Sequence, residues 1–142
     1  MVSDADLATD LRLVVGRLAR RLRHADDGGL TASQLSALSS VEALEPVRLG
    51  DLAGAERVTS PTLTKIVGNL EAAGLIQRSA DPADGRATRI TLTTQGRERL
   101  RRLRTERNVF LQQRLAELGA AERDALRAAL PVLMNIAGQV SK

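Results

Sequence analysis

The stretch from residue 58 to residue 100 constrains the fold more than any other part of the chain. Its first part carries apolar residues at helical spacing, at Leu63, Ile66, Val67 and Leu70. Gly74 is placed to end that helix, and two strand-like segments, 75–80 and 87–93, then flank the charged turn 81–86. A new helical pattern follows directly. This order of helix, hairpin and helix predicts a reading helix with a two-stranded β wing.

Helical periodicity also predicts the helices on either side of this stretch. Predicted helices span residues 4–24, 32–44, 48–55, 60 to the Gly74 cap, 94–118 and 121–138. Ser3 with Asp6, and Thr31 with Gln34, have the spacing of capping boxes. Residues 26–29, two aspartates followed by two glycines, are expected to break the first helix. Pro131 is expected to kink or split the last one. The fold class is therefore mainly α with a small β wing.

Composition excludes several kinds of function. The chain has no cysteine and one histidine, His24, so thiolate metal sites and thiol redox sensing are excluded and a histidine-based metal site is disfavoured. We expect no cofactor and no enzymatic activity, because no nucleophile–base–acid set or phosphate loop is present. No apolar run is long enough to cross a membrane, and no signal peptide is evident, so a cytoplasmic protein is expected.

Positive charge is concentrated in one segment. Residues 86–107 hold eight arginines and two glutamates, a local net charge of +6, whereas the whole chain carries +4. A localised basic stripe favours a polyanionic partner. Aromatic residues are nearly absent, and single-stranded nucleic acids are usually bound by stacking on aromatic rings. Double-stranded DNA is therefore the favoured partner.

The helix that begins at Ser60 has the features of a recognition helix. The N-terminal residues of such a helix face base edges in the major groove. Candidate DNA contacts here are Ser60, Pro61, Thr62, Thr64, Lys65 and, if it reaches, Asn69. Threonine hydroxyls donate and accept hydrogen bonds, and the lysine reaches phosphate or guanine. The alternative is that these side chains only solvate an exposed helix face.

The turn of the hairpin carries charges whose roles differ. An arginine at the tip, Arg86, suits the narrow minor groove, where negative potential concentrates. A carboxylate facing DNA is repelled, so Asp84 is predicted to form a charge-assisted pair that aims Arg86 or Arg89. Alternatively, Asp81 and Asp84 are ordinary turn formers. Arg97, in the first turn of the next helix, is a candidate contact to the DNA backbone.

The segment from residue 52 to residue 96 resembles the MarR family of bacterial transcription regulators. The resemblance lies in L-A-x(4)-V-T-S-P-T-L-T-K-I-V-x-x-L-E-x-x-G-L-I-x-R followed by D-P-x-D-G-R-A-x-x-I-x-L-T-x-x-G. It implies a winged helix-turn-helix lobe over residues 31–96 and helical dimerisation regions over 1–30 and 97–142. It also implies that residues 60–65 read the major groove, and that Asp84 and Arg86 form the wing pair.

The function expected from this resemblance is a homodimeric regulator, a repressor bound to a palindromic operator. Two alternatives remain for its regulation. Either a small-molecule effector, phenolic or otherwise anionic, releases the protein from DNA, or the protein is a regulator without a ligand. Arg12, Arg17, Arg20 and His24 could supply a charge for an anionic ligand, although a solvated helix face or contacts with the partner chain are the favoured interpretation of them. The alternative function is a winged-helix protein-interaction module that binds no operator.

Overall fold

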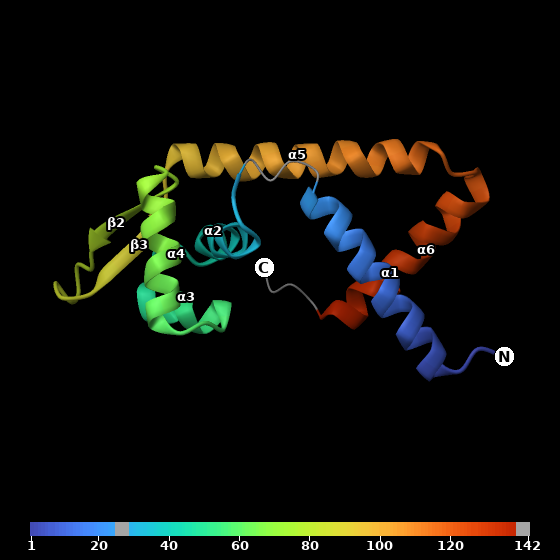
Figure 1. Ribbon diagram of the computed structural model, residues 1–142, viewed down its shortest axis with the longest axis horizontal. Coiled ribbons are helices and arrows are strands. Elements are labelled where there is room, and N and C mark those ends of the chain that lie inside the picture. The colour runs from blue at the N-terminus through green and yellow to red at the C-terminus, as the bar shows by residue number, and fades with distance from the viewer. Residues whose placement is uncertain (25–28, 139–142) are drawn as a thin grey trace. The chain divides into compact units, whose positions relative to one another are not determined.

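The computed structural model describes residues 1–24 and 29–138, so most of the predicted break at 26–29 lies outside the described residues. The chain divides into two compact units, residues 1–106 and 107–142. The helices are α1 Asp4–His24, α2 Ala32–Leu44, α3 Leu49–Glu56, α4 Ser60–Ala72, α5 Thr94–Ala116 and α6 Ala120–Ala137. The strands are β1 Val47–Arg48, β2 Ile76–Ala80 and β3 Thr88–Leu92 (Figure 1).

The first unit contains a winged helix-turn-helix lobe, as the sequence predicts. Helices α2, α3 and α4 pack on one another and on a small antiparallel sheet of strand order β1-β3-β2. The prediction of a two-stranded wing was incomplete, because Val47 pairs with Ile90 and Arg48 with Arg89 to add a third strand. A strand of two residues is too short to leave a periodic signal in the sequence.

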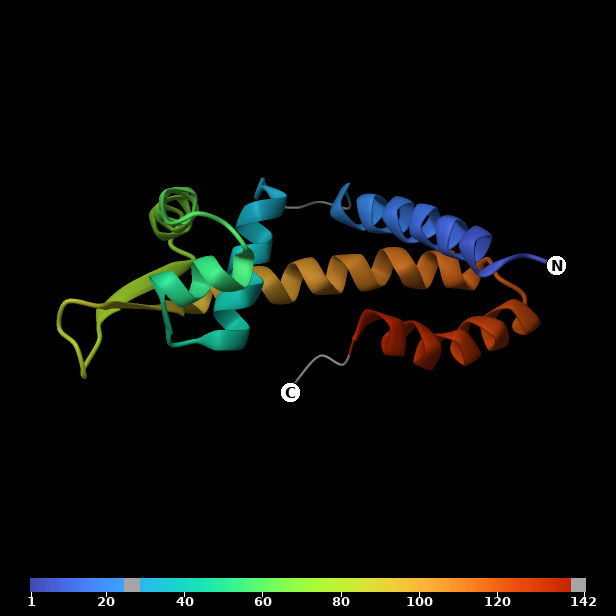
Figure 2. The same cartoon turned by 90° about the horizontal axis from the view of Figure 1, so that it is seen from below.

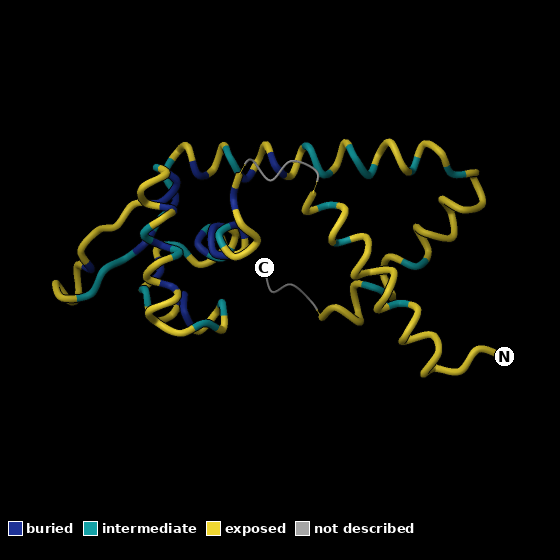
Figure 3. The backbone as a smooth tube through the Cα atoms, viewed as in Figure 1, coloured by how far each residue is buried: buried dark blue, intermediate teal, exposed yellow. Residues whose placement is uncertain are grey.

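The core of the lobe follows the predicted periodicities. Leu63, Val67 and Leu70 of α4 are fully buried, and Ile90 and Leu92 face inward from β3 while Arg89 and Thr91 lie on its other face. Figure 3 shows the buried residues gathered in α2, α4, the sheet and the start of α5. Each such aliphatic side chain stabilises the fold by about 1.5–3 kcal/mol when buried. This packing fixes the positions of α4 and the wing.

Local capping begins and ends the elements where the sequence predicts. Thr31 and Gln34 form a capping box at α2, and Ser3 and Asp6 exchange hydrogen bonds at α1. Gly74, with φ 75°, ends α4: its N–H bonds to the Glu71 carbonyl, and the next N–H bonds to that of Leu70.

The terminal helices are long and present apolar side chains to solvent. No residue of α1 or α6 is buried (Figure 3). The apolar side chains at helical spacing in α6 are not buried in the single chain: Leu126, Leu130 and Ile136 have exposed fractions of 39%, 49% and 66%, and Leu133 is half-buried. Pro131 does not split α6, which runs without a break. Among the described residues, no helix is apolar and long enough to cross a membrane.

Candidate nucleic-acid interface

Helices α3 and α4 form the helix-turn-helix, and the exposed start of α4 carries the predicted reading residues. Seen from below, α4 is viewed along its axis and the wing projects beside it (Figure 2). Thr59 is the N-cap, so the helix begins at Ser60 and Pro61 occupies its second position. All six predicted contacts on this helix are exposed, namely Ser60, Pro61, Thr62, Thr64, Lys65 and Asn69.

Hydrogen bonds within the first turn of α4 determine which donors and acceptors of its threonine hydroxyls remain available to a ligand. The Thr64 hydroxyl donates to the Ser60 carbonyl at 2.8 Å, so its proton is engaged while the oxygen of this exposed residue can still accept a hydrogen bond. The Thr62 hydroxyl accepts from the Thr59 hydroxyl at 2.9 Å, which leaves its own proton to donate. Together they present a donor, an acceptor and a methyl group, the features that distinguish base pairs in the major groove.

The wing is a hairpin whose turn is closed by its own backbone. The Asp81 N–H donates to the Ala87 carbonyl at 2.9 Å, and the Ala87 N–H donates to the Asp84 carbonyl at 3.0 Å. Arg86 is exposed and lines an open groove of about 380 Å³ between the wing and the start of α3. Its side chain forms no ion pair with the described part of the chain.

The buried carboxylate of Asp81 holds the base of the wing. Its side chain is fully buried and contacts Arg48 of β1 at 2.6 Å and Arg89 of β3 at 3.4 Å. It also accepts a hydrogen bond from the Ala83 N–H at 2.9 Å. That hydrogen bond lowers the pKa of Asp81, burial raises it, and the hydrogen bond and charge of Arg48 and the charge of Arg89 lower it further, to a net decrease.

The predicted pairing of Asp84 with an arginine was therefore wrong. The Asp84 carboxylate accepts a hydrogen bond from the backbone N–H of Arg86, at 3.1 Å, which is turn chemistry. The acid that positions an arginine is Asp81, and the arginine it positions in the wing is Arg89. The sequence did not predict this role, because aspartate is common at the start of a turn. Only the folded structure shows that Asp81 is buried and that β1 places Arg48 beside it.

Comparisons with known proteins agree with this geometry. A model of the MarR family matches residues 30–88. An uncharacterized HTH-type transcriptional regulator of Mycobacterium bovis is 37% identical over 135 residues, which cover 94% of each chain. The chain belongs to the MarR family. Members of this family, and the relatives found, are transcriptional regulators rather than enzymes.

Solved structures show the same fold over nearly the whole chain. A putative transcriptional regulator from Pseudomonas aeruginosa is 37% identical, covers 97% of each chain and has a TM-score of 0.84. A MepR variant of Staphylococcus aureus, bound to an oligodeoxyribonucleotide, is 22% identical and has a TM-score of 0.73 over 93% of this chain and 98% of its own. At 22% identity, the likeness to the MepR variant concerns the fold alone.

In this MarR-family chain, arginines of the basic stripe form ion pairs that hold α5 against the lobe. Arg97 forms an ion pair with Glu45, and Arg104 pairs with Glu42 of α2 at 2.7 Å. Arg97 is half-exposed, so the predicted backbone contact would have to compete with Glu45. Much of the local charge that pointed to DNA thus serves internal contacts.

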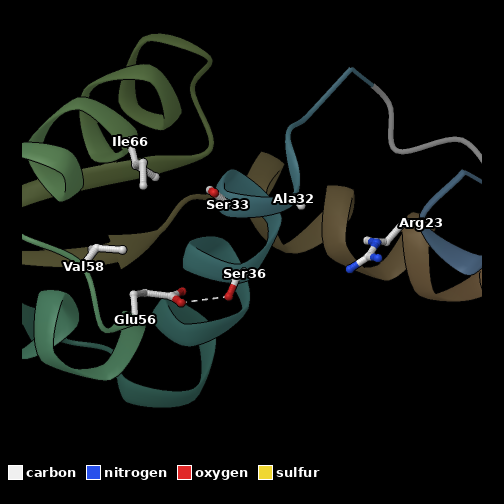
Figure 4. A pocket seen from close by; sticks show the side chains of 7 residues that line it. All are labelled: Arg23, Ala32, Ser33, Ser36, Glu56, Val58 and Ile66. Atoms are coloured by element: carbon white, nitrogen blue, oxygen red, sulfur yellow. Dashed lines mark hydrogen bonds between the residues drawn. The ribbon is translucent and has the colours of Figure 1, made fainter. Parts of the chain in front are cut away.

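Next to the recognition helix lies a cavity of about 340 Å³. Arg23 of α1 lines it, together with Ser33 and Ser36 of α2 and Glu56 of α3. Figure 4 shows Glu56 turned toward Ser36, whose hydroxyl donates to Glu56 Oε2 at 2.8 Å. The four α1 residues considered for an anionic ligand do not line it; they are Arg12, Arg17, Arg20 and His24. The described residues contain no cluster of three or more acidic, histidine or cysteine side chains that would suit a metal ion.

Low pH is expected to destabilise the base of the wing by protonating Asp81. Because the folded state lowers the pKa of this carboxyl, its ionised form stabilises the fold above the unfolded pKa of about 3.9, and this stabilisation is lost as the pH falls through the lower folded value. Asp81→Asn should therefore be less stable than the wild type at pH 7. The difference should shrink below about pH 4, measured by urea denaturation at several pH values.

Asp84→Asn is the matched control, since the exposed Asp84 carboxylate accepts from a backbone N–H without a paired cation. We expect a much smaller change in its stability at pH 7. Equal losses for the two variants would contradict the role assigned to Asp81.

Proposed function

We propose that this MarR-family protein is a homodimeric repressor that binds a palindromic operator in double-stranded DNA. The observation that carries the proposal is the exposed polar surface at the start of α4, beside a wing whose tip arginine forms no ion pair with the described residues. A neighbour of the same fold has been solved with an oligodeoxyribonucleotide, which supports DNA as the partner.

In this proposal the reading residues lie in the major groove and the wing tip lies in the minor groove. Base edges are contacted by Thr62, Thr64 and Lys65, while Ser60 and Pro61 lie at the helix start beside the DNA backbone, and Asn69 extends the reading face if it reaches. Arg86 enters the minor groove. Asp84 shapes the turn, and Arg89 and Arg97 contribute through the ion pairs that hold the wing and α5.

The apolar faces of the terminal helices support the dimer. Exposed apolar side chains recur along α1 and α6: Leu7, Val14, Leu18, Leu126, Leu130, Met134 and Ile136. An exposed apolar face on a helix of this kind marks an association site. We assign dimerisation to residues 1–30 and 97–142, and DNA binding to residues 31–96. Two recognition helices would then fit half-sites about 34–36 Å apart.

Release by a small molecule is the regulatory part of the proposal. The cavity at α1, α2 and α3 has the volume of a site for a small ligand. Arg23 suits the anionic group of a phenolic acid, whereas the Glu56 carboxylate suits a hydrogen-bond donor. Titrating salicylate into a protein–operator complex, followed by fluorescence anisotropy, tests whether a ligand of this class dissociates it.

A salt titration separates this proposal from the protein-interaction alternative. Duplexes selected from a random pool by the purified protein are labelled, and the dissociation constant is measured between 50 and 300 mM salt. We expect an inverted repeat among the selected sequences and affinity that falls steeply with salt, because bound phosphates release counterions. Sedimentation should show a dimer. No affinity for any duplex would exclude the regulator and favour the interaction module.

Substitutions on α4 should change sequence preference rather than affinity alone. Thr62→Ala and Lys65→Ala are each expected to lower operator affinity by about 1–3 kcal/mol and to relax selection at one position in each half-site. Repeating the selection with each variant measures this. A uniform loss on every sequence would instead assign the residue to a phosphate contact.

A further inference from the structure

Arg57, in the turn between α3 and α4, has a backbone conformation that arginine rarely adopts. Its φ and ψ are 55° and 42°, and it is the one non-glycine residue of positive φ in the described ranges 1–24 and 29–138. Its N–H bonds to the Gly54 carbonyl at 3.2 Å, and the following N–H bonds to that of Ala53 at 3.1 Å. Helix ends with this pattern usually have glycine at the left-handed position. An arginine here strains the backbone, and strain of this kind concentrates at functional sites.

The cations of the DNA-binding lobe fall into two groups. Residues 31–96 contain six basic side chains. Three of them form ion pairs: Arg48 and Arg89 with Asp81, and Arg78 with Glu71. The other three have no ion pair among the described residues: Arg57, Lys65 and Arg86. Lys65 and Arg86 are already assigned to DNA in the proposed function. Arg57 is the member of this second group that has no assigned role.

The acid next to Arg57 in the chain is engaged elsewhere. Glu56 Oε2 accepts the Ser36 hydroxyl at 2.8 Å, and Glu56 Oε1 is buried without a hydrogen-bond donor in the described structure (Figure 4). The carboxylate therefore faces the α2 side of the lobe and lies beneath the surface. Arg57 itself is exposed. Its charge is left available to a ligand outside the chain.

We propose that Arg57 binds a DNA phosphate at the edge of the major groove read by α4. The proposal rests on the function proposed above and adds a contact to it. Arg57 lies two residues before the N-cap of α4, so it is held at the end of the helix that enters the groove. Phosphates line both edges of that groove, and contacts to them set the register of the protein on the duplex. Guanidinium groups bind phosphate with paired, charge-assisted hydrogen bonds.

The test compares Arg57→Gly and Arg57→Lys with the wild type, using the full chain, the selected operator and an unrelated duplex. Glycine removes the charge and adopts the left-handed conformation without strain, so this variant should melt at the same temperature or higher. We expect its affinity for both duplexes to fall by roughly 10- to 60-fold at 0.1 M salt. The slope of log affinity against log salt should fall by about two, one for each copy in the dimer. Lysine should restore most of the slope.

Arg123→Ala in α6 is the control for the loss of one charge, since Arg123 is exposed and lies outside the DNA-binding lobe. Its salt slope should match that of the wild type. An Arg57→Gly variant with wild-type affinity and slope would overturn the Arg57 contact and leave the proposed function standing. A wild-type protein that binds neither duplex would overturn the proposed function, and the Arg57 contact with it.

Discussion

Gly96→Ala is expected to lower the free energy of unfolding of the lobe by about 3 kcal/mol or more, because overpacking at a backbone contact leaves no flexible group to yield. Gly96 is buried in the first turn of α5. A Cβ atom there would overlap the carbonyl oxygen of Leu75, and would lie 3.1 Å from its carbonyl carbon and 3.4 Å from Leu92 Cδ2. The Leu75 carbonyl accepts the Thr93 N–H at 3.1 Å, so moving it breaks a further contact.

Urea denaturation followed by circular dichroism measures this loss. Gly54→Ala is the matched control, because a Cβ atom at this exposed position in α3 meets nothing within 4 Å. Alanine is favoured over glycine within a helix by up to about 1 kcal/mol, so the control should be as stable as the wild type or more stable. Two variants of equal stability would show that the close approach at Gly96 is relieved by small backbone shifts.

Arg86→Ala is expected to weaken operator binding by about 1–3 kcal/mol, or roughly 5- to 150-fold, with the dimer and the fold intact. Arg86 is exposed at the tip of the wing, and its backbone N–H, rather than its side chain, bonds to Asp84. Its guanidinium forms no ion pair with the described residues, so the loss should appear in DNA binding and leave stability unchanged. The narrow minor groove, with its concentrated negative potential, is the site such a side chain fits.

Fluorescence anisotropy with the selected operator measures this affinity, and sedimentation checks the dimer. Arg101→Ala is the control, since Arg101 carries the same charge on the basic stripe but pairs with Glu98 of its own helix at 2.6 Å. We expect little change for it. Equal losses for Arg86→Ala and Arg101→Ala would mean that the net charge of the chain, and not the wing tip, determines affinity.

Most of the secondary structure was predictable because its causes are local. The capping pairs at Ser3 and Thr31, and the glycine after α4, lie within a few residues of the groups they satisfy. Apolar spacing placed α4 and both wing strands within one residue of their observed starts. The two-residue β1 was missed because only its pairing with β3 defines it.

The roles of the charged residues were less predictable. Sequence spacing suggested that Asp84 holds an arginine and that the basic stripe over residues 86–107 faces a polyanionic partner. In the structure Asp81 pairs with Arg48 and Arg89. Arg104 pairs with Glu42 of α2, and Arg97 pairs with Glu45, the residue that follows α2. The partners of Arg48 and Arg104 lie 33 and 62 positions away in the chain. Spacing along one element carries no information about pairs so distant.

By itself the sequence determined the order of elements, the exposed polar start of α4, the arginine at the wing tip and membership of the MarR family, because periodicity, capping and local motifs encode them. Only the tertiary structure decided which cations are neutralised. Packing brings acids from α2, α4 and the wing against Arg48, Arg78, Arg89, Arg97 and Arg104. The lobe then keeps Arg57, Lys65 and Arg86 without an ion pair among its described residues, so their charges remain available to a ligand.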